Sequence, residues 1–233
     1  CGAGEIGEAT ASSLGSAGAE VAVAATGADR LTRIEARLGA TTFDTDLADP
    51  VQIGELFVTL KERFGRLDIL VCTEEDRPAP RSLLEVSFSD YRATIARTLD
   101  ATFLCLQKAA HLMVAGGEGG RVIITTSLNA LDFQRGAVDQ EVAQSALRGL
   151  VKTAALDLTP HRITVNGILF GPLRSEVPAD RYDSVGEGAL NPAAPFGDPA
   201  DIARATLWLA DPENAFTTGS VIAVDGGQSA LLP

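Results

Sequence analysis

Short apolar runs rich in β-branched residues alternate along this chain with longer segments in which apolar residues recur every three or four positions. The short runs, which predict strands, lie at 20–25, 41–47, 66–71 and 122–126. The periodic segments, which predict helices, lie at 6–14, 50–64, 87–114, 138–158 and 199–209. This alternation indicates an α/β fold.

Two of the helices have clear sequence signals. The segment 138–158 follows a strand that ends near Ser127, and its apolar residues share a spacing of four: Val142, Ala146, Leu150, Ala154 and Leu158. The helix at 50–64 begins with Asp49 as an N-cap acceptor, a proline in the first turn, and Gln52 reaching back toward the cap.

The chain opens on the second half of a βαβ unit. A glycine-rich turn leads into the helix at 6–14 and the strand at 20–25. A parallel sheet of this kind needs a strand before the turn, at its centre. We therefore expect that roughly ten residues absent from this sequence precede Cys1 and supply the first strand.

Composition and charge exclude several classes of function. The 233 residues carry a net charge of −12, which disfavours nucleic acid and anionic membranes as partners. No apolar run approaches the ~20 residues of a membrane span, and no signal peptide is visible. The three cysteines lack metal-ligand spacing and are too few for a disulfide framework, so we expect no metal site and a cytoplasmic protein. The length fits one domain over 1–233.

Several segments together resemble the short-chain dehydrogenase/reductase family. The segments that carry the resemblance are Ser127 with the helix that follows it, 66–71, Asp46-Leu47, 160–167 and the closing run 218–227, which ends in Asp-Gly-Gly. The resemblance covers essentially the whole chain. It implies a Rossmann-like, doubly wound parallel sheet in a three-layer α/β/α arrangement, with further strands at 160–167 and 218–227.

The resemblance also assigns four catalytic positions, and three of them carry other residues here. Family members use an Asn to hold a relay water, a Ser to polarise the carbonyl, a Tyr as the proton donor and a Lys that lowers the pKa of the Tyr. The corresponding residues are Thr98, Ser127, Gln140 and Gln144, in that order. A glutamine amide donates a hydrogen bond but cannot deliver a proton at any useful pH.

The missing groups have no simple replacement elsewhere in the sequence. The tyrosines are Tyr91 and Tyr182, and neither has a lysine four residues further on. Lys152 follows Gln144 by eight residues, which is about 12 Å along a helix. Tyr182 is the candidate for a displaced proton donor.

The cofactor-binding positions implied by the resemblance are partly retained: Gly2, Gly4, Ile6, Gly7, Asp46 and Leu47. Glycines in such a turn let backbone amides approach a pyrophosphate at a helix N-terminus. Glu5 is either inserted after the middle glycine or replaces it, and in both registers it brings a negative charge near the phosphates. A tight structural turn without a ligand is the alternative interpretation.

At the end of the second family strand, this chain has Ala25 and Thr26, which cannot supply the acidic or arginine contact to the ribose that is common there. Arg30 and Arg33 lie further into the next helix, where solvated helix charges are the simpler interpretation.

The family's Asn-Asn-Ala-Gly segment is also changed, and it reads Cys72-Thr73-Glu74-Glu75 here. If Glu74 and Glu75 face a pyrophosphate, each contact costs up to roughly 4 kcal/mol. If they turn outward to water, they cost nothing. We expect either no NAD(P) binding or only weak binding.

The segment 173–197 is rich in Pro, Gly, Asp and Glu and predicts a substrate-covering loop, without a motif that names a substrate.

Three hypotheses follow for the function. The first is a degenerate, catalytically impaired subunit (a pseudoenzyme) that forms a homo-oligomer, or a hetero-oligomer with an active relative. The second is a repurposed pocket for dehydration, isomerisation or cyclisation, in which Ser127, Gln140 and Gln144 donate hydrogen bonds to an oxyanion. The third is an NAD(P)-dependent oxidoreductase for a carbonyl or alcohol with a displaced proton donor.

Overall fold

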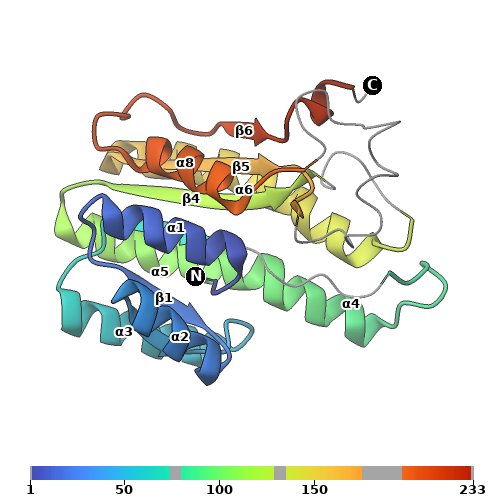
Figure 1. Ribbon diagram of the computed structural model, residues 1–233, viewed down its shortest axis with the longest axis horizontal. Coiled ribbons are helices and arrows are strands. Elements are labelled where there is room, and N and C mark those ends of the chain that lie inside the picture. The colour runs from blue at the N-terminus through green and yellow to red at the C-terminus, as the bar shows by residue number, and fades with distance from the viewer. Residues whose placement is uncertain (1, 74–79, 129–134, 175–195, 232–233) are drawn as a thin grey trace.

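The computed structural model describes residues 2–73, 80–128, 135–174 and 196–231, and within these ranges the chain forms one parallel sheet system covered by helices on both faces (Figure 1). The strands are β1 (Ala22–Ala25), β2 (Thr41–Asp44), β3 (Ile69–Cys72), β4 (Gly120–Ser127), β5 (Ile163–Phe170) and β6 (Val221–Val224). The α-helices are α1 (Glu5–Ser16), α2 (Ala28–Leu38), α3 (Pro50–Phe64), α4 (Phe88–Ile95), α5 (Ala101–Gly116), α6 (Val138–Leu158) and α8 (Pro199–Ala210). Short 3₁₀ helices lie at Thr159–His161 and Gln228–Leu231.

All described strand pairs are parallel, and they fall into two groups. One sheet pairs β1 with β2, and the other has the order β3-β4-β5-β6. The α/β fold class predicted from the sequence is thus confirmed. The strands are shorter than predicted at several ends: the run 66–71, for example, is regular only from Ile69.

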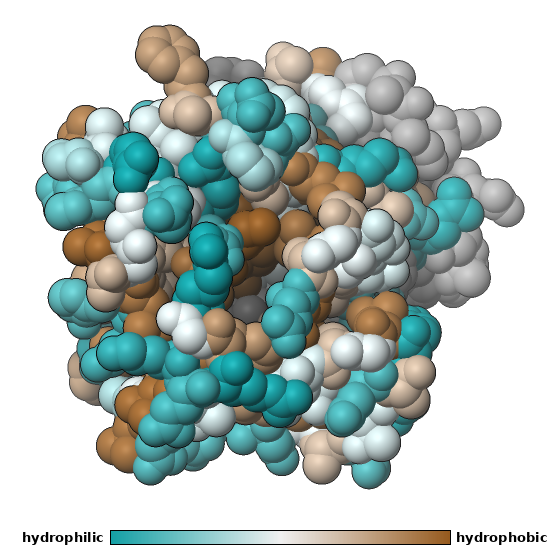
Figure 2. All heavy atoms as spheres, turned by 90° about the vertical axis from the view of Figure 1, so that its left-hand side faces the viewer, coloured by the Kyte–Doolittle hydropathy of each residue, from teal (hydrophilic) through white to brown (hydrophobic). Residues whose placement is uncertain are grey.

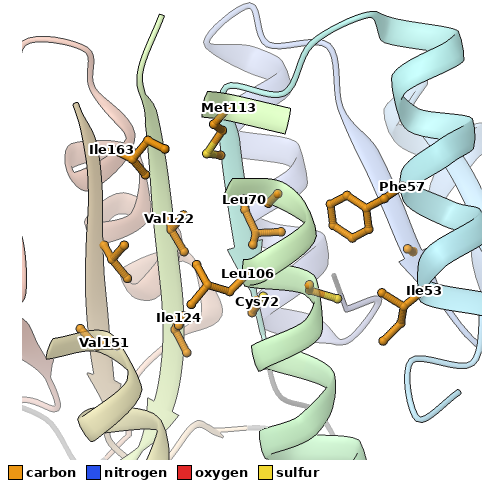
Figure 3. Close-up of a cluster of buried hydrophobic side chains, with 14 of the residues drawn as sticks. Ile53, Phe57, Leu70, Cys72, Leu106, Met113, Val122, Ile124, Val151 and Ile163 are labelled. Carbon is orange, nitrogen blue, oxygen red and sulfur yellow. The ribbon is translucent and has the colours of Figure 1, made fainter. Parts of the chain in front are cut away.

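Alternate residues of the central strands face opposite helix layers. Val122 and Ile124 of β4 belong to the core that α3, α5 and α6 cover (Figure 3). Ile123 of the same strand belongs to the core that α1 and α8 cover, together with Ile168 of β5. Because β4 and β5 are buried on both faces, they consist almost entirely of apolar and small residues.

Sequence signals placed two helices at their observed bounds. In α3, the Asp49 side chain accepts a hydrogen bond from the Val51 amide at 2.9 Å, and Gln52 donates to the same carboxylate at 3.1 Å. The helix α6 covers 138–158, as its apolar spacing predicts. The predicted helix or helix pair at 87–114 is one nearly continuous rod, in which a π-helical turn at Ala96–Asp100 joins α4 to α5.

The two sheets are separated by a cavity, which we call the slot. It lies between β1 and β3, has a volume of about 430 Å³, and is lined by α1 on one side and α3 on the other. On the face where the strands begin, Figure 2 shows a hollow with hydrophobic walls near the middle of the molecule.

No described helix is long and apolar enough to cross a membrane.

The close packing of α6 gives a stability prediction. Replacing fully buried Leu147 by alanine removes apolar contacts and leaves a cavity, so Leu147→Ala is expected to lower the free energy of unfolding by about 2–5 kcal/mol. Leu156, on the same helix, is 76% exposed, and Leu156→Ala is expected to change stability by no more than about 0.5 kcal/mol. Urea unfolding of both variants checks this, and equal losses would contradict the assigned burial.

The turn after β6 gives a pH prediction. Burial opposes ionisation of the Asp225 carboxyl, but hydrogen bonds outweigh it and lower its pKa; the amides of Gly227 and Ser229 donate at 2.9 and 2.8 Å. A lowered folded-state pKa gives stability that is present above the unfolded-state pKa of about 3.9 and is lost as the pH falls through the folded value.

Asp225→Asn is therefore expected to lower the free energy of unfolding by about 1–3 kcal/mol at pH 7, and the difference from the wild type should shrink below about pH 4. Urea unfolding at a series of pH values measures this. Asp157→Asn, at an exposed position on α6, serves as the control, and a pH-independent deficit in Asp225→Asn would contradict the assignment.

Candidate functional site

The order of the strands determines where a site can form. From β1 the chain moves outward to β2, and then crosses to β3 on the other side of the slot. The carboxyl ends of β1 and β3 therefore flank the point where the strand order reverses, which is where doubly wound proteins bind ligands. A cleft of about 170 Å³ opens there, and its lining includes four of the predicted site residues: Gly2, Asp46, Leu47 and Thr98.

Ser127 and Gln144 come together at the end of β4. The backbone amide of Ser127 donates to Oε1 of Gln144 at 3.2 Å, and the Gln144 side chain is completely buried. Nε2 of Gln144 has no hydrogen-bond partner among the described residues. A lysine has no acceptor atom and could not make this contact. The amide at the family's lysine position thus ties α6 to β4, and it brings no positive charge.

Gln140 lies one turn before Gln144, between two acidic neighbours. Gln140, Asp139 and Glu141 are all at least nine-tenths buried. Carboxylates in the first turn of a helix interact favourably with the helix dipole. The start of α6 therefore has two acidic groups and an amide at the place where the family has a tyrosine next to a cation.

An ionic cluster that the sequence analysis missed holds Asp139 in place. Thr94 of α4 donates to the Asp139 carboxylate at 2.9 Å, and the Arg81 guanidinium lies 3.8 Å from the same oxygen and 2.6 Å from Asp90. The Arg81 backbone also donates to the Gly136 carbonyl at 2.7 Å. These residues are far apart in the sequence, and no local pattern links them.

Thr98 lies in the π-helical turn between α4 and α5 and is buried. Its carbonyl accepts a hydrogen bond from the Thr102 hydroxyl at 2.7 Å. Thr98 lines the cleft together with Thr102 and Thr125, so the π turn lies beside the cleft.

The glycine-rich turn has an acidic residue at the start of its helix. Gly4 is the N-cap of α1, and Glu5 is the first helical residue, exposed at the N-terminus. Ile6 is buried in the core against β4 and β5, and Gly7 lines the slot. Of the predicted cofactor positions in this turn, only Gly2 therefore lines the cleft.

The carboxylate of Asp44, at the end of β2, accepts a hydrogen bond from the backbone just after β1. The amide of Gly27, which has a φ of 109°, donates to Asp44 at 3.2 Å. Arg30 lies 3.9 Å from Glu8 of α1, an ion pair that agrees with its interpretation as a surface helix charge. Asp46 is exposed, and its carboxylate accepts from the Ala48 amide at 2.9 Å.

Cys72 cannot serve as a replacement nucleophile. Burial raises the pKa of its thiol to about 12, and nearby Cys105 contributes in the same direction. The thiol is therefore protonated at neutral pH. Its carbonyl accepts from the Thr125 hydroxyl at 3.5 Å, which links β3 to β4. No described group of three His, Cys, Asp or Glu residues is placed to hold a metal.

The described residues fit a nicotinamide dinucleotide poorly. Glu5 lies at the N-terminus of α1, where a bound pyrophosphate would need backbone amides without a competing negative charge. Gln144 is at the position where the family has a cofactor-binding lysine, and its side chain is buried in a hydrogen bond with Ser127. We therefore derive no catalytic step through such a cofactor.

Some predicted positions lie outside the described residues. These are Glu74 and Glu75, Tyr182, and most of the predicted substrate-covering loop at 173–197. At its two ends, Leu173 and Gly197 form a parallel bridge.

Comparison with known proteins agrees with the Rossmann-like α/β fold described above. Residues 2–229 match the family model described as "Enoyl-(Acyl carrier protein) reductase". The chain belongs to the short-chain dehydrogenase/reductase family, whose members found in these comparisons are named as oxidoreductases and dehydrogenases.

Two curated relatives and one solved structure illustrate the similarity. The chain is 34% identical over 176 residues to "Uncharacterized oxidoreductase YohF" of Escherichia coli, covering 72% of this chain and 67% of that protein. It is 32% identical over 233 residues to "(2S)-[(R)-hydroxy(phenyl)methyl]succinyl-CoA dehydrogenase subunit BbsC" of Thauera aromatica, covering 97% and 91%. The crystal structure of acetoin dehydrogenase from Enterobacter cloacae matches with a TM-score of 0.86 at 33% identity, covering 99% of this chain and 94% of that one.

The Gln144–Ser127 contact gives a third prediction. Gln144→Ala leaves the buried Ser127 amide without its acceptor and should lower the free energy of unfolding by at least about 1–3 kcal/mol. Gln107→Ala makes the same change on the exposed face of α5 and should stay within about 0.5 kcal/mol of the wild type. Denaturant unfolding compares the two. Indistinguishable midpoints would show that the contact does not support the fold.

Proposed function

We propose that this chain is a catalytically impaired subunit of a short-chain dehydrogenase/reductase oligomer, and that hydride transfer in the assembly occurs on an active family partner. The observation that carries the proposal is the Gln144 side chain, which is fully buried and hydrogen-bonded to the end of β4. With no cation at this position and an amide at Gln140, these two positions supply no proton donor tuned to neutral pH within the part of the site that the structure describes.

Two further observations support the proposal. The described site is acidic where a dinucleotide needs neutral or positive groups, at Glu5 and near Asp44. In addition, the relative from Thauera aromatica is named as a subunit of a dehydrogenase, and the match covers nearly all of this chain.

The second candidate is an NAD(P)-dependent oxidoreductase with a displaced proton donor, and the names of the family relatives favour it. Under this alternative, Tyr182 or another group supplies the proton, and Ser127 still polarises the substrate carbonyl. The two candidates differ in whether this chain alone binds NADH or NADPH.

Calorimetric titration with NADH and NADPH therefore separates them. We expect either no binding or binding weaker than the low micromolar range, and we expect Glu5→Gln to raise any residual affinity severalfold by removing a charge at the helix N-terminus. Glu62→Gln, at an exposed position on α3, is the control and should leave the affinity unchanged. A low-micromolar dissociation constant for the wild type would reject the proposal.

Activity of the assembled oligomer gives the direct test. We expect no substrate-dependent absorbance change at the nicotinamide band from this chain alone, and a change from its complex with an active family member. Substituting the tyrosine of that partner should abolish the signal, whereas Ser127→Ala in this chain should not. Turnover by the purified chain alone, or loss of turnover in Ser127→Ala with the fold intact, would favour the second candidate.

A further inference from the structure

The polar side chains at the place where β4 meets α6 are buried in this structure. Ser127 is 7% exposed, Gln140 is 8% exposed and Gln144 is completely buried, and the acidic groups of Asp139 and Glu141 beside them are buried as well. A ligand can reach these groups only after the first turn of α6 has moved away from the end of β4. This part of the candidate site is therefore closed, and the contacts that hold the start of α6 decide when it opens.

The Arg81 side chain joins the start of α6 to the start of α4. One guanidinium nitrogen lies 2.6 Å from the carboxylate of Asp90 in the first turn of α4, and another lies 3.8 Å from the carboxylate of Asp139 in the first turn of α6. Thr94, one turn further along α4, donates to the same Asp139 oxygen at 2.9 Å. Because α4 packs against α6 (Figure 1), these side chains link two helices in direct contact.

The α4 side of this link is held in a fixed geometry. Ser87 is the N-cap of α4, and its hydroxyl donates to the Asp90 carboxylate at 2.7 Å and accepts from the Asp90 amide at 3.1 Å. The carboxylate that binds Arg81 is thus already oriented by the helix cap. The guanidinium is therefore anchored on α4, from where it reaches α6.

A backbone contact joins the same two segments beside the side-chain link. The Arg81 amide donates to the Gly136 carbonyl at 2.7 Å, and Arg81 pairs with Ala137 in an isolated parallel bridge. Gly136 has a φ of 83°, and a Cβ atom there would lie 3.2 Å from Cβ of Pro80 and 3.3 Å from the Arg81 nitrogen. A glycine is needed for this backbone conformation and this close approach. One ionic and one steric feature thus independently place Arg81 at the start of α6.

The burial of Asp139 makes this link hard to break. Its side chain is 5% exposed, and within the described ranges Arg81 is the one cation at ion-pair distance from it. A buried carboxylate that loses its cationic partner is left as an uncompensated charge, which strongly favours its exposure to water. Moving Asp139 into water means moving the first turn of α6, which also carries Gln140.

We propose that Arg81, Asp90, Thr94, Gly136 and Asp139 form a clasp, which keeps the first turn of α6 closed over the end of β4 and is released as one unit when the site opens. Arg81 is a positioning residue in this device, because it acts on the neighbouring position 140 through the helix. The core around β4 and β5 stays in place when the clasp is released. The clasp does not rest on the proposed function.

The test measures how fast a thiol at position 140 reacts with a water-soluble aromatic disulfide. Gln140→Cys introduces this thiol, and Cys1→Ser removes the terminal one. The buried thiols of Cys72 and Cys105 remain as reporters of wider unfolding. In this background, Arg81→Gln should raise the reaction rate of the introduced thiol at least about tenfold, because the unpaired buried charge favours the open state.

Two matched controls accompany the variants. Arg92→Gln makes the same change at an exposed position on α4 and should keep the rate within about twofold of the background. Gly136→Ala should raise the rate severalfold without removing a charge, because the added methyl group pushes the Arg81 backbone away. Gly39→Ala is its control, since Gly39 has a φ of 64° and no neighbour within 4 Å of an added Cβ.

Combining the two clasp variants tests whether the contacts act together. Arg81→Gln with Gly136→Ala should raise the rate by less than the product of the single effects, because either change releases the same unit. Independent, multiplicative effects would overturn the proposal. So would an unchanged rate in Arg81→Gln, or an equal acceleration at Cys105, which would show that the whole fold loosens and not the start of α6.

Hydrogen exchange repeats the comparison in chains that lack the introduced thiol, so the result does not depend on the folding of Gln140→Cys. Amides 141–144 of α6 should exchange at least about tenfold faster in Arg81→Gln than in the wild type, whereas amides 151–155 of the same helix should be unchanged. Equal acceleration along the whole helix, or none at its start, would reject the clasp.

Discussion

The parallel hydrogen-bond ladder between β4 and β5 is the interaction on which the rest of the molecule depends. It joins the two longest described strands over eight residue pairs, from Gly120 with Ile163 to Ser127 with Phe170. Successive residues face opposite cores, so a shift of one residue would move every apolar side chain to the wrong face. The ladder therefore fixes the position of Ser127 at the end of β4. Because the Ser127 amide donates to Gln144, the ladder also determines where along β4 the Gln144 side chain of α6 must lie.

Several described residues in the region that corresponds to a family active site make contacts within the scaffold. Gln144 supports the end of β4, and Asp139 is held by Thr94 and Arg81. The Cys72 thiol is buried with a raised pKa, and the backbone carbonyl of Cys72 accepts a hydrogen bond from Thr125 of β4. Each of these contacts stabilises the fold, and none of them offers a proton donor or a cation to a ligand. The family's packing is retained, and at the two positions where the resemblance implies a tyrosine and a lysine this chain has Gln140 and Gln144.

Local sequence signals predicted the parts of the fold that depend on local physics. The bounds of α3 and α6 follow from a capping pattern and a regular apolar spacing, which act within a few residues. Strand ends were less accurate because pairing with neighbours, and not composition, decides where a short strand begins.

The predicted site residues remain a prediction, and the structure brings only some of them together. Thr98, Asp46, Leu47 and Gly2 line one cleft. The partners of Gln144 and Asp139 could not be predicted, because an amide or a carboxylate pairs with whatever the tertiary fold brings near it. Arg81 is separated from Asp139 by 58 positions in the sequence, and only the packing of α4 on α6 brings them together.

The π-helical turn at Ala96–Asp100 absorbs one extra residue in the rod formed by α4 and α5. A π turn holds one more residue than an α turn at nearly the same total rotation, so α4 keeps the orientation that it would have in a regular helix without that residue. If the turn became regular α-helix with the residue still present, α4 would rotate by about 100° relative to α5, and Thr94 and Asp90 would turn away from Asp139 and Arg81. The π geometry of this one turn therefore keeps α4 in phase with α5.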